Sequence, residues 1–356
     1  MKQRKTSFEL LRIVLIFAIA MYHLFLYNGV FYQEYTLNAI YGLILSAGTA
    51  VPCDYAFIAL STYYLIPKKH KWNPRRFLSF AALSFTLYLL KMGILRGLFG
   101  YNNTEYFIDL FLVTGAWWYV TQYLLLMLYY PLLNRLIHTE KPVKLYLCTA
   151  VMGILFLING ATNVMNFWND LVMFVFTYLL VGCLYVHPVK WDFFARHKKI
   201  ILLVVCFSIS LAMIAACVYV KLPLSGASVS WGNQFIQRII GRYCFPAMIV
   251  GLGVFELFRN WELSYFKTIH SLAKIILYVF LMHEPLLGIF WYFKKCWNTM
   301  AYDPAPQFFL WTVIYLAACF VFAGIVQQMY TRIIEPLWNK LIDKICNDYA
   351  ERKSPC

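Results

Sequence analysis

The chain has 356 residues, of which 62% are hydrophobic and only 13% are charged. Soluble domains carry about 25% charged residues, so this composition excludes an ordinary soluble globular protein and favours a protein embedded in a membrane. The formal net charge of +15 comes mainly from loops between apolar segments. It fits contact with an anionic lipid leaflet and is no indication of nucleic-acid binding.

Apolar segments of a length that can cross a bilayer, about 20 residues, recur along the whole chain. Ten are expected, near residues 9–28, 41–66, 77–95, 115–136, 144–162, 169–187, 199–220, 241–258, 273–293 and 309–330. If the N-terminus is cytoplasmic, most of the 31 Lys and Arg residues fall in cytoplasmic loops, as the positive-inside rule requires. The sequence therefore predicts an all-α polytopic membrane protein with about ten transmembrane helices and both termini in the cytoplasm.

The first segment carries two ionisable residues at different depths. Arg12 lies at its expected cytoplasmic edge, and His23 follows eleven residues later, about 16 Å further along a helix. That places His23 about halfway through a hydrocarbon core about 30 Å thick, where an ionisable group usually faces a cavity or a protein interior. The alternative is a structural histidine bonded to neighbouring backbone.

The second segment contains Asp54, about 19 Å above the inner face if the helix ends near residue 67. A capping role is the alternative, because Pro52 can break the helix and leave N–H groups for a carboxylate. The basic loop 68–76 follows and ends in Arg75 and Arg76. Positive-inside bias alone accounts for it, yet arginine also suits bidentate binding of phosphate, so a phosphate-rich donor could dock here.

The ninth segment contributes His283 and Glu284, roughly 15–17 Å from the inner face. Together with His23 and Asp54 they place four titratable groups from three helices in one layer. A helix kink at the following proline, with polar groups satisfied locally, is the alternative. Glu256, near the inner end of the eighth segment, is expected to be paired or to extend toward the headgroups.

The C-terminal segment LWNKLIDKICNDY places its apolar residues on one helical face, with Lys340 and Lys344 elsewhere on the turn. This pattern predicts a helix that lies along the inner membrane surface. The expected division is a transmembrane domain, residues 1–335, and a cytoplasmic amphipathic tail, residues 336–356. The ten cysteines form no C-x-x-C pair and lie mostly in apolar segments, so no metal site is expected.

Four motifs in this order resemble the acyltransferase-3 family of membrane acyltransferases. Arg12-x10-His23 is similar to the family's first-helix motif, and VPCDYAFIALSTYYLI resembles its second-helix pattern, with Ser61-Thr62 in place of Ser-Gly. LYVFLMHEPLL resembles its late Tyr…His-Glu-Pro segment, and YTRIIEPLW resembles its closing Glu-x-Pro. The family's cytoplasmic Arg-x-x-Arg is represented only by the adjacent Arg75 and Arg76, which weakens their assignment to the donor.

The resemblance implies an O-acetyltransferase of the cell membrane, in bacteria the cytoplasmic membrane, with acetyl-CoA as acyl donor and a glycan or lipid-linked saccharide as acceptor. His23 would be the general base on the acceptor hydroxyl, oriented by a carboxylate, either Asp54 or Glu284. The catalytic residues expected on this basis are His23, Asp54, His283 and Glu284. The residues expected to bind the donor are Arg12, Ser61, Arg75, Arg76 and Glu335.

Two other classes of function remain open from the sequence. A proton-coupled transporter or flippase also uses buried His, Asp and Glu side chains, but the paired broken helices and repeats typical of such proteins are not recognisable here. A receptor or structural membrane protein without turnover would leave the polar layer unexplained.

Overall fold

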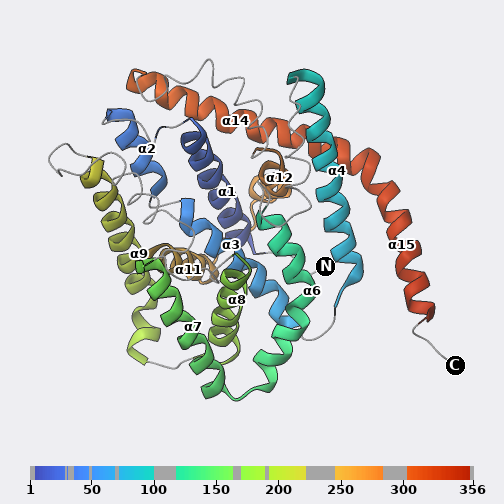
Figure 1. Ribbon diagram of the computed structural model, residues 1–356, viewed down its shortest axis with the longest axis horizontal. Helices are drawn as coiled ribbons and strands as arrows, with labels where there is room; N and C mark the ends of the chain where they lie inside the picture. Colours follow the sequence, from blue (N-terminus) through green and yellow to red (C-terminus); the bar gives the residue numbers. More distant parts are fainter. Residues whose placement is uncertain are drawn as a thin grey trace.

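The computed structural model describes residues 5–28, 30, 36–47, 50–68, 72–99, 118–162, 170–188, 192–221, 245–283 and 303–352. Within these ranges every element is a helix (Figure 1), which confirms the all-α prediction for this part of the chain. The helices in order are α1 (Thr6–Tyr27), α2 (Leu37–Ala47), α3 (Ala50–Leu65), the 3-10 turn η2 (Ile66–Lys68), α4 (Pro74–Phe99), α6 (Trp118–Thr139), α7 (Pro142–Thr162), α8 (Asp170–Val186), α9 (Asp192–Lys221), α11 (Phe245–Arg259), α12 (Lys267–His283), α14 (Ala305–Met329), the π-helical turn η4 (Tyr330–Ile334) and α15 (Glu335–Arg352).

Each of the ten predicted apolar segments falls at least partly on a helix. The second segment, 41–66, falls on two helices, α2 and α3, where one continuous helix was expected. Pro52 lies in the first turn of α3, where its missing N–H removes no intrahelical hydrogen bond. Proline therefore belongs to the start of this helix instead of breaking its interior.

Membrane-spanning character is clear for four stretches of the described chain. By length and composition, Thr6–Leu26, Pro74–Ile94, His197–Val220 and Ala305–Asn347 are long and apolar enough to cross a bilayer. Shorter apolar helices occur at Leu37–Ser46, Pro142–Phe156 and Asp170–Val186. The protein is therefore a helical membrane protein, and the count of ten crossings stays a prediction.

The outer surface of the fold is rich in large apolar side chains. Leu132 is 68% exposed, Phe207 65% and Val143 80%. Apolar exposure on this scale is unusual for a soluble monomer, whereas it suits contact with lipid tails.

Two central helices, α1 and α3, organise the packing. α1 packs on α3 and α12, and α3 packs on α8 and α11. In Figure 1, α7, α9 and α11 lie on one side of this pair and α4 and α15 lie on the other, while α14 runs across the top of the view past the end of α1. Helices from opposite ends of the chain are thus neighbours, and the residues of α1 and α12 can form one site.

Glycine allows two of these contacts to be very close. A Cβ atom at Gly251 of α11 would lie 2.2 Å from the carbonyl oxygen of Pro52, and one at Gly253 would lie 2.2 Å from Sγ of Cys206 in α9. Small residues at helix contacts let backbones approach each other in membranes, where no hydrophobic force drives helices together. α11 therefore packs closely between α3 and α9, with Gly251 at the contact with α3 and Gly253 at the contact with α9.

Candidate active site

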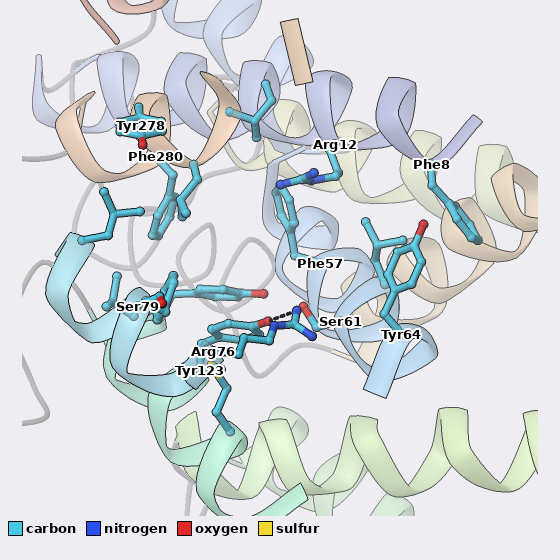
Figure 2. Close-up of a pocket in the computed structure, with 18 of the residues that line it drawn as sticks. Phe8, Arg12, Phe57, Ser61, Tyr64, Arg76, Ser79, Tyr123, Tyr278 and Phe280 are labelled. Atoms are coloured by element: carbon cyan, nitrogen blue, oxygen red, sulfur yellow. Dashed lines mark hydrogen bonds between the residues drawn. The ribbon is translucent and has the colours of Figure 1, made fainter. Parts of the chain in front are cut away.

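A cavity of about 1000 Å³ lies among α1, α3, α4, α6, α12 and α15 (Figure 2). Aromatic rings form much of its wall. Its charged and polar lining residues include Lys5, Arg12, Asp54, Ser61, Arg76 and Glu335. A large, mostly apolar cavity with a few converging polar groups is typical of a small-molecule site. Along α1 the lining extends from Lys5 to Ile19, about 21 Å at 1.5 Å per residue.

Arg12 projects from α1 toward this space (Figure 2). Its Nη1 donates to Oε2 of Glu9 at 3.1 Å, and the Glu9 side chain is only 4% exposed. A buried carboxylate paired in this way orients the guanidinium and would be costly to leave uncompensated. Glu9 is not among the site residues predicted from the sequence, although its position three residues before Arg12 is the spacing of a same-face helical pair.

The adjacent residues Arg75 and Arg76 point in different directions. Arg76 lines the cavity, and its Nη2 donates to the hydroxyl of Tyr123 on α6 at 3.3 Å (Figure 2). Arg75 is exposed and forms an ion pair with Asp343 of α15, with 3.2 Å between Nη2 and Oδ1. Successive side chains on a helix are rotated by about 100°, so the two arginines occupy different environments.

Asp54 and Ser61 reach the cavity from α3, about two helical turns apart. Tyr119, in the first turn of α6, lines the cavity beside them, and its hydroxyl lies within interaction range of Ser61, Asp54 and Arg12. These four side chains therefore face a common space. Tyr119 was missed because aromatic residues near a helix end are normally attributed to the membrane interface.

Aromatic rings shape the walls around this group. Tyr119 is stacked with Tyr123 at a centroid distance of 6.5 Å and an interplanar angle of 11°, and Phe80 packs edge-on against Tyr123 at 5.0 Å. Phe57 and Phe280 both meet Tyr119 edge-on, at 6.3 and 5.5 Å. Flat rings in these arrangements leave narrow apolar space that suits planar or slender ligand groups.

Glu335 lines the cavity from the first turn of α15. It lies within electrostatic range of Tyr278 and Tyr330, whose rings are 6.0 Å apart. The next turn of α15 is fixed to α4 because Nε1 of Trp338 donates to Oγ1 of Thr86 at 2.9 Å. The closing part of the chain therefore forms part of the cavity wall.

Two histidines from opposite ends of the chain form a hydrogen-bonded pair. Nδ1 of His23 lies 2.9 Å from Nε2 of His283, and the two rings are stacked with an interplanar angle of 16°. Nδ1 of His283 lies 2.8 Å from the carbonyl oxygen of Val279. His283 is 1% exposed, whereas His23 is only partly buried.

These contacts determine the tautomers of a neutral pair. A carbonyl oxygen only accepts, so Nδ1 of His283 carries the hydrogen and its Nε2 carries the lone pair. Nδ1 of His23 must then donate to that lone pair. Nε2 of His23 is left as the basic nitrogen of the pair.

The histidine pair lies just beyond the end of the cavity at Ile19, the end farthest from Lys5 on α1. Ile19, the last lining residue of α1, is one helical turn before His23, about 6 Å along the axis. Phe280 lines the cavity from α12, and its ring centroid is 6.0 Å from that of His283. The aromatic end of the cavity therefore adjoins the pair.

The structure thus groups the predicted site residues unevenly. The cavity brings together Arg12, Asp54, Ser61, Arg76 and Glu335. His23 and His283 contact each other beyond the Ile19 end of the cavity, and Arg75 lies on the surface. Glu284 is outside the residues described. Among those that are described, no cluster of three or more His, Cys, Asp and Glu side chains could hold a metal ion.

Glu256 is paired, as expected from its position at the inner end of α11. Its Oε1 accepts from Nη2 of Arg259 at 2.6 Å, and Lys198 of α9 also contacts it. The carboxylate therefore joins α9 and α11 and lies apart from the residues that line the cavity.

Comparison with known proteins agrees with the family that the motifs resemble. The family model of acyltransferase-3, described as an acyltransferase domain, matches residues 5–326. Searches of the curated proteins and of the solved structures gave no significant match. Because the match covers nearly the whole chain, including α1, α3 and α12, the chain belongs to the acyltransferase-3 family of membrane acyltransferases.

Proposed function

We propose that this protein is an O-acetyltransferase that moves an acetyl group from acetyl-CoA to a hydroxyl of a cell-surface or lipid-linked glycan. One observation carries the proposal: the cavity connects a region lined by Arg12 and Arg76 to an end at Ile19, which is one helical turn from His23. A donor-binding region and a base are thereby joined along one path.

The cationic part of the cavity suits the phosphates of the donor. Lys5, Arg12 and Arg76 all line it, and arginine forms strong charge-assisted hydrogen bonds with phosphate. The cavity extends about 21 Å along α1, which gives room for a long arm that ends in a thioester. The aromatic slot at Phe57, Tyr119 and Phe280 would direct the slender end of that arm toward the histidine pair.

His23 acts as the general base in this proposal. Its Nε2 takes the proton from the acceptor hydroxyl while the hydroxyl oxygen attacks the thioester carbonyl carbon. A C–O bond forms and the C–S bond breaks, and His23 returns the proton to the leaving sulfur. His283 holds Nδ1–H of His23 throughout, so the proton is exchanged only at Nε2.

The two substrates would approach from opposite sides of the membrane. The cavity lining at Lys5 and Arg76 lies at the helix ends that the charge pattern assigns to the cytoplasm, where acetyl-CoA is available. His23 lies four residues beyond the lining on α1 and is partly exposed. An acceptor glycan on the outer side could therefore reach the base without passing through the donor cavity.

The test is acetyl release from radiolabelled acetyl-CoA by purified protein in lipid nanodiscs, compared with the His23→Gln variant. The proposal expects slow hydrolysis by the native protein alone, faster release when an acceptor glycan is added, and neither with the variant. Mass spectrometry of surface polysaccharide with and without the protein would identify the acceptor. Binding without any acetyl release, together with proton-dependent solute flux in vesicles, would overturn the proposal in favour of a transporter.

A further inference from the structure

α15 has two faces with different environments. Trp338, Asn339 and Ile342 line the cavity, and Ile342 is 2% exposed. Leu337, Leu341 and Ile345 recur every fourth residue and are 63%, 47% and 46% exposed. One helix therefore forms a wall of the cavity and presents an apolar stripe outward.

Two lysines border the apolar stripe between residues 337 and 345. Lys340 and Lys344 are both exposed and, at 100° per residue, flank the apolar stripe on the side away from the cavity. Asp343 lies on another side of the helix and forms an ion pair with Arg75, and two further acidic residues, Asp348 and Glu351, follow in the last turns of α15. Apolar side chains bordered by lysines are the pattern of a helix that lies in the headgroup region of a bilayer.

The apolar stripe continues into the membrane-spanning part of the chain. Val321, Ile325 and Met329 of α14 are 64%, 53% and 51% exposed, and the same four-residue spacing continues through Ile333 in η4 to Leu337. Figure 1 shows α15 following directly on α14 at the edge of the fold. The face that meets lipid tails on α14 thus leads directly to the exposed face of α15.

We propose that the exposed apolar face of α15 binds an anionic phospholipid leaflet. This contact holds the opposite face of the helix, with Trp338 and Ile342, in place as a wall of the donor cavity. The part that concerns the donor rests on the proposed function. Lipid charge would then control how well the donor binds. Loss of the contact would let α15 move away from α4, to which it is joined by the hydrogen bond from Trp338 to Thr86.

The lipid contact can be tested without any enzyme activity. A nitroxide attached at Leu341→Cys, in a background with the other reactive cysteines replaced by serine, is examined in nanodiscs that contain phosphatidylglycerol. The expected result is high accessibility to oxygen and low accessibility to a water-soluble nickel complex. A label that is as accessible to nickel as one at an aqueous site would overturn the proposal, whether or not the donor binds.

The coupling is tested by measuring acetyl-CoA affinity in nanodiscs with and without phosphatidylglycerol. Each lysine near an anionic leaflet strengthens the binding of a helix to the membrane by about fivefold. The double variant Lys340→Gln/Lys344→Gln should therefore lose most of the gain in affinity that phosphatidylglycerol gives to the native protein. The matched control is Lys141→Gln/Lys267→Gln, which removes the same charge from exposed positions outside the cavity and should retain the gain.

The outcomes separate this proposal from the proposed function. Affinity for acetyl-CoA that is equal in both kinds of nanodisc, or an equal response of the two double variants, would overturn the coupling. Absence of acetyl-CoA binding in every membrane, with the nitroxide buried in lipid, would contradict the proposed function and support the lipid contact.

Discussion

Single residues at this site depend on particular neighbours. Glu9 orients Arg12 by an ion pair, and His283 orients His23 through Nδ1. A side chain held by a second residue loses less conformational freedom when it binds or reacts. Substitutions of the neighbour should therefore affect function less than substitutions of the residue it holds. The effect of the first substitution should also disappear once the held residue has been replaced.

The histidine pair gives the sharpest prediction. His23→Gln keeps a polar side chain but cannot take up a proton, so transfer should fall by about 10²–10⁴-fold while donor affinity is retained. His283→Leu removes the acceptor for Nδ1–H of His23 but leaves the base itself in place, so transfer should fall by up to about tenfold, the effect of one hydrogen bond to His23. Steady-state and single-turnover kinetics on folded, nanodisc-embedded protein would measure both effects.

The double variant distinguishes a positioning role from a purely structural one. If His283 acts through His23, adding His283→Leu to His23→Gln should cause no further loss of transfer. Independent, multiplicative losses would contradict the positioning role. Full transfer activity of well-folded His23→Gln protein would contradict the assignment of His23 as the base.

The two adjacent arginines form a matched pair of test positions. Arg76→Ala removes a cavity cation and should weaken acetyl-CoA binding at least tenfold, because charge-assisted contacts to phosphate are strong. Arg75→Ala removes the same charge from an exposed ion pair and should have only a small effect, since such pairs contribute little. If titration calorimetry shows the same loss of acetyl-CoA affinity for both variants, the specific role of Arg76 in the cavity is contradicted and a general electrostatic effect of both arginines is supported.

At the scale of helices, the position of α3 depends on how closely α11 can approach it. Gly251 meets the carbonyl oxygen of Pro52 in α3, two residues before Asp54, the first residue of this helix that lines the cavity. A side chain at Gly251 must displace backbone, which cannot move as a flexible side chain does.

Gly251→Ala should therefore destabilise the protein by about 1–3 kcal/mol and lower its thermal unfolding midpoint in detergent. Gly324→Ala in α14 is the control, because a Cβ there would meet no atom within 4 Å. At that position the higher helix propensity of alanine predicts an unchanged or higher midpoint. A similar decrease for both variants would show that the close contact of α11 with α3 is not the cause.

At the scale of the whole molecule, the charge pattern predicts that both termini and the loop 68–76 are cytoplasmic. Cysteines introduced at Lys69→Cys and Asn102→Cys, both outside the described residues, should differ in intact cells. An impermeant thiol reagent should label only the second, in a background in which the ten native cysteines are replaced by serine. Equal labelling of the two positions would refute this topology.

The membrane class, the helical segments and the family could all be derived from the sequence. Hydropathy and helical rise are local properties, so residue spacing alone predicts that Arg12 lies near one edge of the bilayer and His23 near its middle. The motif order predicted the acyltransferase-3 family, which the match over residues 5–326 confirms.

Only the tertiary structure decided which side chains meet. The contact of His23 with His283 joins residues 260 positions apart, and the separation of Arg76 from Arg75 depends on the rotation of α4 about its axis. Sequence spacing specifies neither the neighbours of a helix nor the direction in which its faces point. These are set by packing between helices, such as that of α1 with α12. Packing therefore determined that a histidine, His283, contacts His23 and that the end of the chain closes the cavity.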